Sequence, residues 1–560
     1  MYDLKAEGLP PTEKFSRRVF HSAVVVGGYV YIDGGEVSWL EGSGFVLIPV
    51  NSTISIPLNI SWSTSSVQQY FGLILGRTAA GVPVLDNQCA WVDPSGKAFT
   101  IWGGIATHQG EPPPSHIWRF SVDGKGGGSW TKQEPKGSTM IELGKNVRST
   151  HAAWTQDKEK GYWIGGYADS STDTSVSGET TLALPGMVEY NMSTGELRNK
   201  STLPGLGLYG TTINGAAQFV PGFGSKKEGV ILLMGGAESP IVLPVGVNSL
   251  IGRDFNSVYL YDTLTEKWFN QTTKGERPPA RQKFCLVGVK GRNGTYEIFM
   301  YGGLSQQNWA ASEDVYVLSL PGFVFFKASL PSGTSTPRLD HACGLAGKRQ
   351  MLSIGGTDAS NPGMPNRLFE PDPWKNGLGI FDLTKMRWTD KYDADAEEYE
   401  SPDVVKQWYD QGGLESVAWS SADVKSLFID ESRLKSSDSD SIPSTAQPTD
   451  SPKSSSSQPP VPGRANASSA IIGGTVGGVV FLLLLGGLAW MLMVRKRKVV
   501  KAAKDCEEDE KNKVRYSGPQ QLECNRYMPP EMDGGFIGVE VPGFRERMEL
   551  SADRNAELPG

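Results

Sequence analysis

Short apolar runs that end in a pair of glycines recur six times before residue 390. Each run places aliphatic and aromatic residues over about five positions, which is typical of a β-strand. The glycine pair permits a turn with positive φ, which a side chain would strain. Further apolar runs follow each pair, so the pattern predicts four short strands per repeat. The pairs are Gly34-Gly35, Gly103-Gly104, Gly165-Gly166, Gly235-Gly236, Gly302-Gly303 and Gly355-Gly356.

The other strands of each repeat can be placed from the same pattern. In the first copy, SAVVV and YVYI flank Gly27-Gly28, and a two-residue Gly-Gly connection is typical of a tight hairpin. GELRN and GFVFFK are expected as the fourth strands of the third and fifth copies. In the other copies the fourth strand carries Trp62, Trp130, Trp268 or Trp388. The third strands are expected at TISIPLNIS, SHIWRFSV, GMVEYN, NSVYLYD, EDVYVLSL and GLGIFDL.

Six such sheets have to pack on one another, because a single four-stranded sheet cannot bury both of its faces. The repeated residues resemble the kelch motif, whose unit is one four-stranded blade of a β-propeller. The resemblance covers residues 16–390 and implies an all-β fold, a six-bladed kelch β-propeller, after an N-terminal extension at 1–15. Segment 391–434 still contains Trp408 and Trp419, so we expect it to pack on the propeller.

Beyond the propeller, the pattern changes to that of a membrane anchor. Residues 435–469 are rich in Ser and Pro and poor in apolar side chains, which predicts a disordered stalk. Residues 470–494 are 25 consecutive uncharged and mostly apolar positions, long enough for one transmembrane helix. Six basic residues within 495–504 place the disordered tail, 495–560, in the cytoplasm by the positive-inside rule. We therefore expect a single-pass type I membrane protein with an extracellular or lumenal propeller.

Glycosylation sequons support this orientation, because seven precede the predicted span and none follows it. The first 18 residues lack the apolar core of a secretory signal, so we expect an upstream signal segment. The alternative is a cytosolic propeller on a membrane anchor, which would put the basic cluster on the translocated side. The sequons begin at Asn51, Asn59, Asn191, Asn199, Asn270, Asn293 and Asn466.

Charge and domain order together indicate a binding protein. The chain has 54 basic and 61 acidic side chains, a net charge of −7, and its one basic cluster follows the span, which argues against nucleic acid as a partner. Gly473 and Gly477 in the span have the small-xxx-small spacing that favours a homodimer. Propeller, stalk, span and short tail resemble the single-pass kelch-repeat membrane proteins of filamentous fungi. We expect a protein or glycan ligand outside the membrane and a docking role for the tail.

The loops between each glycine pair and the third strand gather on one face of the expected ring. Exposed aromatics over a rigid scaffold are typical of binding surfaces. Trp39, Trp309, Trp374 and Asp358 lie in these loops and are the candidate ligand-binding residues. The alternative is that the indoles pack their own loops.

An enzyme is the second hypothesis, because the repeat also resembles the propeller of galactose-oxidase-like enzymes, which bind copper with two Tyr and two His. His21, His151 and His341 stand 13, 14 and 14 residues before a glycine pair. This register indicates repeat elements held by hydrogen bonds beside the first strand. The chain also lacks the Gly-x-Ser-x-Gly, phosphate-loop and Cys-x-x-Cys motifs. We therefore expect no catalytic residues and no cofactor.

Two further groups of residues have side chains that can form a metal site or a disulfide. His108 and His116, with Glu111 between them, lack the fixed spacing of a metal site, and we expect no metal there. Cys285 and Cys343 fall in first strands of neighbouring blades. Stacked sheets lie about 10 Å apart, so we expect two buried free thiols and no disulfide.

Overall fold

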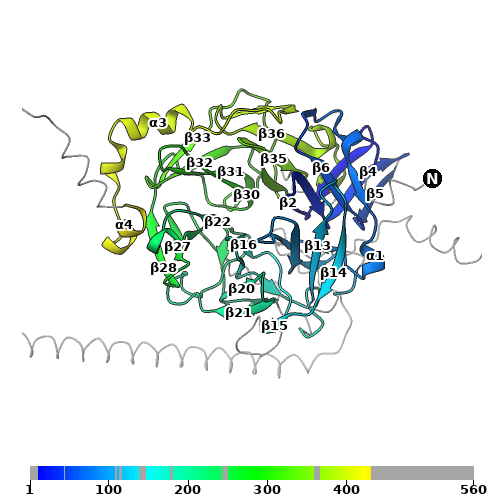
Figure 1. Cartoon of the computed structure of the whole chain (residues 1–560), viewed down its shortest axis with the longest axis horizontal. Coiled ribbons are helices and arrows are strands. Elements are labelled where there is room, and N and C mark those ends of the chain that lie inside the picture. The colour runs from blue at the N-terminus through cyan, green and yellow to red at the C-terminus, as the bar shows by residue number, and fades with distance from the viewer. Residues whose placement is uncertain are drawn as a thin grey trace, which may run out of the picture. The chain divides into compact units, whose positions relative to one another are not determined.

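The computed structural model contains a ring of antiparallel sheets (Figure 1). Five of the six glycine pairs directly follow the second strand of a sheet, and Gly302-Gly303 lies near the end of such a strand. The structure describes residues 10–42, 44–107, 110–112, 116–137, 147–176, 181–240, 242–243, 250–358 and 366–429. These residues belong to one compact unit of the chain. The stalk, the span at 470–494 and the tail that the sequence predicts lie outside the described residues, as do residues 1–9. No helix within the described ranges has the length and apolarity needed to cross a membrane.

The sheets are the six blades of a ring, and in each the four main strands follow one another in chain order. Blade 1 contains β2 (Ser22–Val26), β3 (Tyr29–Asp33), β6 (Thr53–Pro57) and β8 (Gly72–Ile74). Blade 2 contains β10 (Cys89–Val92), β11 (Ala98–Trp102), β13 (Ile117–Val122) and β14 (Gly128–Gln133). Blade 3 contains β16 (Ala153–Gln156), β17 (Lys160–Ile164), β20 (Met187–Asn191) and β21 (Glu196–Lys200), with β15 (Lys136–Gly137) at its edge.

The second half of the ring repeats this arrangement. Blade 4 contains β22 (Ala216–Val220), β23 (Val230–Met234), β27 (Ser257–Asp262) and β28 (Lys267–Thr272). Blade 5 contains β30 (Arg281–Lys290), β31 (Tyr296–Ser305), β32 (Val315–Leu320) and β33 (Val324–Lys327), with β29 (Lys274–Gly275) at its edge. Blade 6 contains β34 (Ala342–Ala346), β35 (Gln350–Ile354), β36 (Leu378–Asp382) and β37 (Arg387–Thr389).

Six apolar clusters fill the six seams between neighbouring blades, and together they close the ring. Tyr31 of blade 1 packs with Phe99 of blade 2, and Phe299 of blade 5 packs with Phe381 of blade 6. Ile56 of blade 1 shares a cluster with Ile380 of blade 6 across the closing seam. The remaining clusters join blades 2 and 3, 3 and 4, and 4 and 5. Each sheet therefore buries both of its faces against its two neighbours in the ring, which a single blade could not do.

The closing seam is also fastened outside the blades. β7 (Trp62–Ser63) pairs with β38 (Lys391–Tyr392), and the Tyr392 hydroxyl donates to the Leu58 carbonyl at 2.8 Å. The expectation that Trp62 lies in the fourth strand of blade 1 is therefore wrong, because that strand is the three-residue β8 further along the chain. Trp130, Trp268 and Trp388 do lie in fourth strands.

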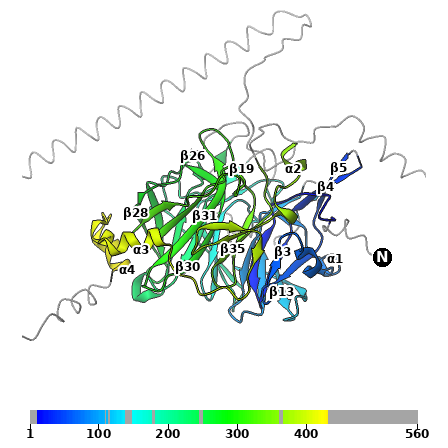
Figure 2. The same ribbon diagram turned by 90° about the horizontal axis from the view of Figure 1, so that it is seen from above.

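The connections between second and third strands lie on one face of the ring, here called the loop face (Figure 2). They form short sheets of their own, and the N-terminal strand joins one of them. These strands are β1 (Phe15–Val19), β4 (Glu36–Glu41), β5 (Gly44–Pro49), β9 (Leu85–Asp86), β12 (Ile105–Ala106), β18 (Tyr167–Ala168), β19 (Thr181–Ala183), β24 (Ala237–Glu238), β25 (Val242–Leu243) and β26 (Ile251–Gly252). The short helical turns α2 (Asn366–Phe369) and η3 (Lys375–Gly377) lie in the connection between the second and third strands of blade 6. Elsewhere, η1 (Val67–Tyr70) joins the third and fourth strands of blade 1, α1 (Arg77–Ala80) follows that fourth strand, and η2 (Ser225–Lys227) joins the first and second strands of blade 4.

The segment after blade 6 packs against the outer edges of blades 4 and 5. It contains α3 (Asp403–Asp410), η4 (Gly413–Ser416) and α4 (Ala422–Phe428). Phe428 stacks edge to face on Phe323 with ring centroids 4.8 Å apart, and the Gln271 side-chain amide donates to the Ala418 carbonyl at 2.9 Å. The apolar residues of this segment thus extend the seam between the two blades.

Candidate functional site

Six residues at the inner rim of the ring share an unusual backbone conformation. Five of them stand two residues before the first strand of a blade and the sixth is the third residue of such a strand, and each has φ between 54° and 62° although none is glycine. The left-handed region costs an ordinary residue about 1–2 kcal/mol, so the surrounding structure has to hold these residues there. We call this set the axial collar: Phe20, Asn87, His151, Asn214, Lys283 and Asp340.

Backbone hydrogen bonds link collar residues of successive blades. The N–H of Asn87 donates to the Phe20 carbonyl at 2.7 Å, and the N–H of Phe20 donates to the Asp340 carbonyl at 3.2 Å. Asn214 donates in the same way to His151 at 2.8 Å, and Lys283 to Asn214 at 3.0 Å. The positive φ turns each peptide group toward its neighbour around the axis, so the collar joins the blades where their first strands begin.

The collar surrounds a cavity of about 410 Å³ that continues along the first strands. Lys283 Nζ lies 3.1 Å from Asp340 Oδ1, so the two charges at the rim compensate each other. Asn87 Nδ2 lies 3.5 Å from His151 Nε2, and the Asn214 amide donates to Gln282 at 3.0 Å. The cavity thus has amide, imidazole and carboxylate groups around its rim and a compensated charge.

Burial determines the protonation of the collar imidazole. It lowers the pKa of His151 well below the ordinary value, and the positive charge of Lys283 lowers it further. His151 is therefore a neutral ring that accepts or donates a hydrogen bond without carrying charge. Close by, burial raises the pKa of Asp86 well above its ordinary value, with Glu36 and Asp340 adding to the shift.

His21, His151 and His341 stand at similar distances before a glycine pair, which indicates equivalent positions. The structure places them at two different positions. His151 is a collar residue, whereas His21 and His341 each follow a collar residue by one position. The two rings pack against the glycine pair of the preceding blade: a Cβ at Gly355 would lie 2.7 Å from His21 Cε1, and one at Gly302 would lie 2.8 Å from His341 Cε1. Burial lowers the pKa of both rings to about 3.

The candidate aromatics of the loop face are packed into the protein rather than presented to solvent. Trp39 is 4% exposed, within a small cluster that includes Val37 and Val50, and its indole N–H donates to Glu41 at 2.9 Å. Trp309 is half-buried against Leu304. The expectation of exposed aromatics is therefore wrong for Trp39.

Trp374 and Asp358 take part in a buried network around two arginines. The Arg338 guanidinium carbon lies 4.1 Å from the centre of the Trp374 ring, and Arg338 also pairs with Asp372. Asp358 interacts electrostatically with Arg17. The structure does not bring the four candidate residues together around one hollow. The cavity is lined instead by collar residues, of which only His151 was named from the sequence, and there as a structural repeat element.

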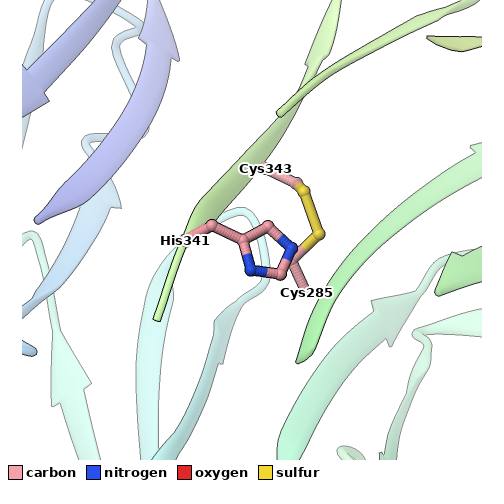
Figure 3. Close-up of side chains that lie close together, drawn as sticks. All are labelled: Cys285, His341 and Cys343. Carbon is pink, nitrogen blue, oxygen red and sulfur yellow. A yellow bond between two sulfur atoms is a disulfide. The ribbon is translucent and has the colours of Figure 1, made fainter. Parts of the chain in front are cut away.

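A disulfide joins Cys285 and Cys343 across the seam between blades 5 and 6, so the expectation of two free thiols is wrong (Figure 3). The sheet spacing of about 10 Å holds for stacked faces, but first strands converge at the axis, and these two Cα atoms are 5.7 Å apart. Both cysteines line the cavity. Cys89 is a buried free thiol, and burial raises its pKa.

One cluster among the described residues has the composition of a metal site. Cys285, Cys343 and His341 place one potential ligand atom each within 4.8 Å of one another. As long as the disulfide is intact, the two sulfur atoms are not thiolates and cannot hold an ion in the usual way. His108 lies outside the described residues, and His116 Nδ1 lies 3.1 Å from Glu134.

The sequons differ in exposure. Asn59, Asn270 and Asn293 are exposed, whereas Asn51, Asn191 and Asn199 are half-buried and Asn466 lies outside the described residues. The Asn191 side chain accepts hydrogen bonds from the backbone of Ser193 and Thr194 within a tight turn.

Comparisons with known proteins agree with the repeat pattern. No protein-family model matches the chain. A kelch repeat-containing protein of Arthroderma benhamiae is 24% identical over 412 residues, which cover 69% of this chain and 58% of that protein. A serine/threonine-protein phosphatase of Arabidopsis thaliana, BSL2, is 31% identical over 107 residues, 19% of this chain and 10% of that protein. The chain therefore spans little more than half of the first relative. The similarity to the kelch repeat-containing protein and the ring of four-stranded sheets both support the assignment of this chain to the kelch family.

Proposed function

We propose that the propeller is a binding module whose loop face, centred on the axial collar, takes a neutral polar group of a protein or glycan ligand. The observation that carries the proposal is the collar itself. Its backbone is linked between blades in a strained conformation, and its side chains surround the mouth of the axial cavity. Strained residues cluster at binding sites because the scaffold around them is rigid enough to hold them there.

The chemistry of the rim favours an uncharged ligand group. Lys283 and Asp340 neutralise each other, and burial keeps His151 neutral, so the rim offers little net charge to attract an ion. Asn87 and Asn214 each provide an amide with donors and an acceptor, which suits hydroxyl and amide groups. Phe20 adds a half-buried apolar ring beside them. Sugar hydroxyls and the amides of a protein loop fit these groups better than phosphate or carboxylate does.

The proposal also includes attachment of the propeller to a membrane. We infer a single-pass type I protein from the apolar run at 470–494 and the basic residues after it, with the stalk holding the propeller outside the membrane. The tail at 495–560 would then report or localise ligand binding in the cytoplasm, and the Gly-rich span would pair two copies. These sequence features support our proposal that the chain is a single-pass membrane kelch-repeat protein like those of filamentous fungi.

The binding site is tested with a double variant, Asn87→Gly and Asn214→Gly, which removes both amides and keeps the positive φ that glycine tolerates. Ligands found for the parent protein on glycan arrays and in cross-linked pull-downs are measured again with the variant. We expect at least about a tenfold loss of affinity, since two ligand hydrogen bonds contribute about 1 kcal/mol each. Lys158→Ala, exposed in the β16–β17 turn on the opposite face, is the matched control. Equal affinity in parent and double variant would reject the site.

Two further measurements separate the proposal from its alternatives. Copper analysis of the purified protein tests the galactose-oxidase-like enzyme, and stoichiometric copper would replace the binding module as the conclusion. Treatment of the expressed full chain with an N-glycosidase tests the topology. A shift in electrophoretic mobility supports a lumenal propeller. An unchanged mobility would support the cytosolic arrangement.

A further inference from the structure

The disulfide between Cys285 and Cys343 stands beside an imidazole at the wall of the axial cavity. Figure 3 shows the His341 ring next to the bond between the two sulfur atoms. The two sulfurs and one ring nitrogen lie within 4.8 Å of one another, and all three residues line the cavity. The ring is fixed in place, since it meets Tyr301 edge to face with centroids 5.2 Å apart and lies over Gly302.

Ligand geometry allows these atoms to hold one ion once the S–S bond is open. With Zn–S near 2.3 Å and Zn–N near 2.0 Å, tetrahedral ligands are separated by about 3.8 Å for two sulfurs and about 3.6 Å for sulfur and nitrogen. The ligand atoms lie within 4.8 Å of one another, so the sulfur–nitrogen separations exceed that spacing by no more than about an ångström. The two bonded sulfurs reach their spacing by moving apart when the S–S bond opens. The sulfurs come from strands β30 and β34 of different blades, so the site depends on the closed ring.

We propose that Cys285, Cys343 and His341 form a two-state site, a disulfide when oxidised and a three-ligand site for a thiophilic divalent metal ion when reduced. A dithiol reductant supplies two electrons and two protons: its own thiols become a disulfide as the protein S–S bond breaks and two cysteine thiols form. The metal ion then displaces both thiol protons to solvent as two metal–sulfur bonds form, and His341 supplies the nitrogen. The fourth position faces the cavity and takes water.

The consequence is that metal binding and the cross-link between blades 5 and 6 exclude each other. In the oxidised protein a covalent bond joins the two first strands at the axis. In the reduced protein the metal ion joins the same two strands and places a metal-bound water at the wall of the cavity. The contents of the cavity thus depend on the redox state of the surroundings.

The test uses the full chain with Cys506→Ser and Cys524→Ser, which removes the thiols outside the described residues. The protein is reduced with dithiothreitol, desalted without oxygen and titrated with Zn²⁺ against a chromophoric chelator. We expect one tightly bound Zn²⁺ per reduced chain, none at that affinity in the oxidised chain, and release of protons on binding. Co²⁺ in place of Zn²⁺ should give thiolate-to-metal charge-transfer absorption.

His341→Ala should weaken Zn²⁺ binding by at least about tenfold, and Cys285→Ser should abolish it. His21→Ala is the matched control, because His21 occupies the same position in blade 1 without neighbouring cysteines. Cys89→Ser controls for the remaining thiol. The proposal is overturned if the reduced chain binds no Zn²⁺ more tightly than the oxidised one, or if His341→Ala and His21→Ala behave alike. Loss of far-ultraviolet circular dichroism on reduction would also overturn it, because the site requires the folded ring.

Discussion

The backbone N–H of Asn87 donates to the carbonyl oxygen of Phe20 across the seam between blades 1 and 2, and both residues have positive φ. Lys283 and Asn214 repeat this relationship between blades 5 and 4. The side chains at these positions differ from one blade to the next, so the backbone conformation is what the repeat preserves. The strain is offset by hydrogen bonds that satisfy peptide groups at the buried inner rim.

Replacement of Asn214 by Gly and by Ala separates backbone strain from side-chain contacts. Both variants lose the amide that donates to Gln282, but only alanine retains a Cβ at φ 56°. We expect Asn214→Gly to be more stable than Asn214→Ala by about 1 kcal/mol, the lower end of the left-handed penalty. Urea unfolding followed by tryptophan fluorescence measures the difference. An alanine variant as stable as the glycine variant would show that the collar carries no strain.

The order of the strands and the number of sheets could be predicted from the sequence because both depend on local patterns of apolar residues and glycine pairs. Five-residue apolar runs beside glycine pairs located the second and third strands of all six blades. The prediction for Trp62 in blade 1 is wrong because η1 separates this residue from the fourth strand. That strand has only three residues, too few to show an apolar pattern. Long-range closure through β7 and β38 leaves no local signal at all.

Trp374 and Trp309 should respond differently to truncation. The Trp374 ring contacts the Arg338 guanidinium and lies 4.6 Å from Trp388 between ring centroids, so Trp374→Ala removes a cation–π contact and leaves a cavity. We expect it to lower the free energy of unfolding by about 3 kcal/mol. Trp309→Ala removes a half-buried ring and should lower it by about 1 kcal/mol. Thermal unfolding of both variants measures this, and equal losses would contradict the packing role of Trp374.

The exposed sequons should be the occupied ones if the propeller enters the secretory pathway. Asn59, Asn270 and Asn293 are exposed, whereas the Asn199 side-chain oxygen is buried beside Gly186. We expect glycans at the first three positions and an unmodified Asn199, measured by peptide mass spectrometry after enzymatic release. Asn293→Gln should remove one glycan mass and leave the other two. Glycans at Asn199 with none at the exposed positions would contradict this reading of exposure.

The site was harder to predict from sequence than the fold, for physical reasons. The sign of φ is not visible for a non-glycine residue, and only the Asn, His and Asp members of the collar belong to types that tolerate the left-handed region well. Such residues just before each first strand are the signal that could have located it. The disulfide could not be predicted from the spacing of stacked sheet faces, because Cys285 and Cys343 lie where the first strands of neighbouring blades converge.

Buried neutral histidines should make the propeller less stable in acid. Burial lowers the pKa of His21 to about 3 in the folded chain, with the charge of Arg18 contributing. The unfolded value is about 6.5, so the unfolded chain binds the proton first as the pH falls. The folded pKa is the lower one, and stability is therefore intact above about pH 6.5 and is lost as the pH falls from there toward 3. Each such ring lowers the free energy of unfolding by about 1.4 kcal/mol per pH unit in this window.

His21→Gln and His341→Gln isolate this effect from the acidic groups, since burial raises the pKa of Asp86 and Glu297 and gives them the opposite sign. Between about pH 7.5 and pH 5 the parent should lose about 2 kcal/mol more than either variant, the share of one histidine with an unfolded pKa near 6.5. Urea unfolding at the two pH values measures the free energy of unfolding of each protein. The change between the two pH values is then compared between parent and variant, so that any pH-independent cost of the substitution cancels. A variant that loses as much stability as the parent would mean that the replaced ring is protonated in the folded chain, and the lowering of its pKa by burial would then be wrong.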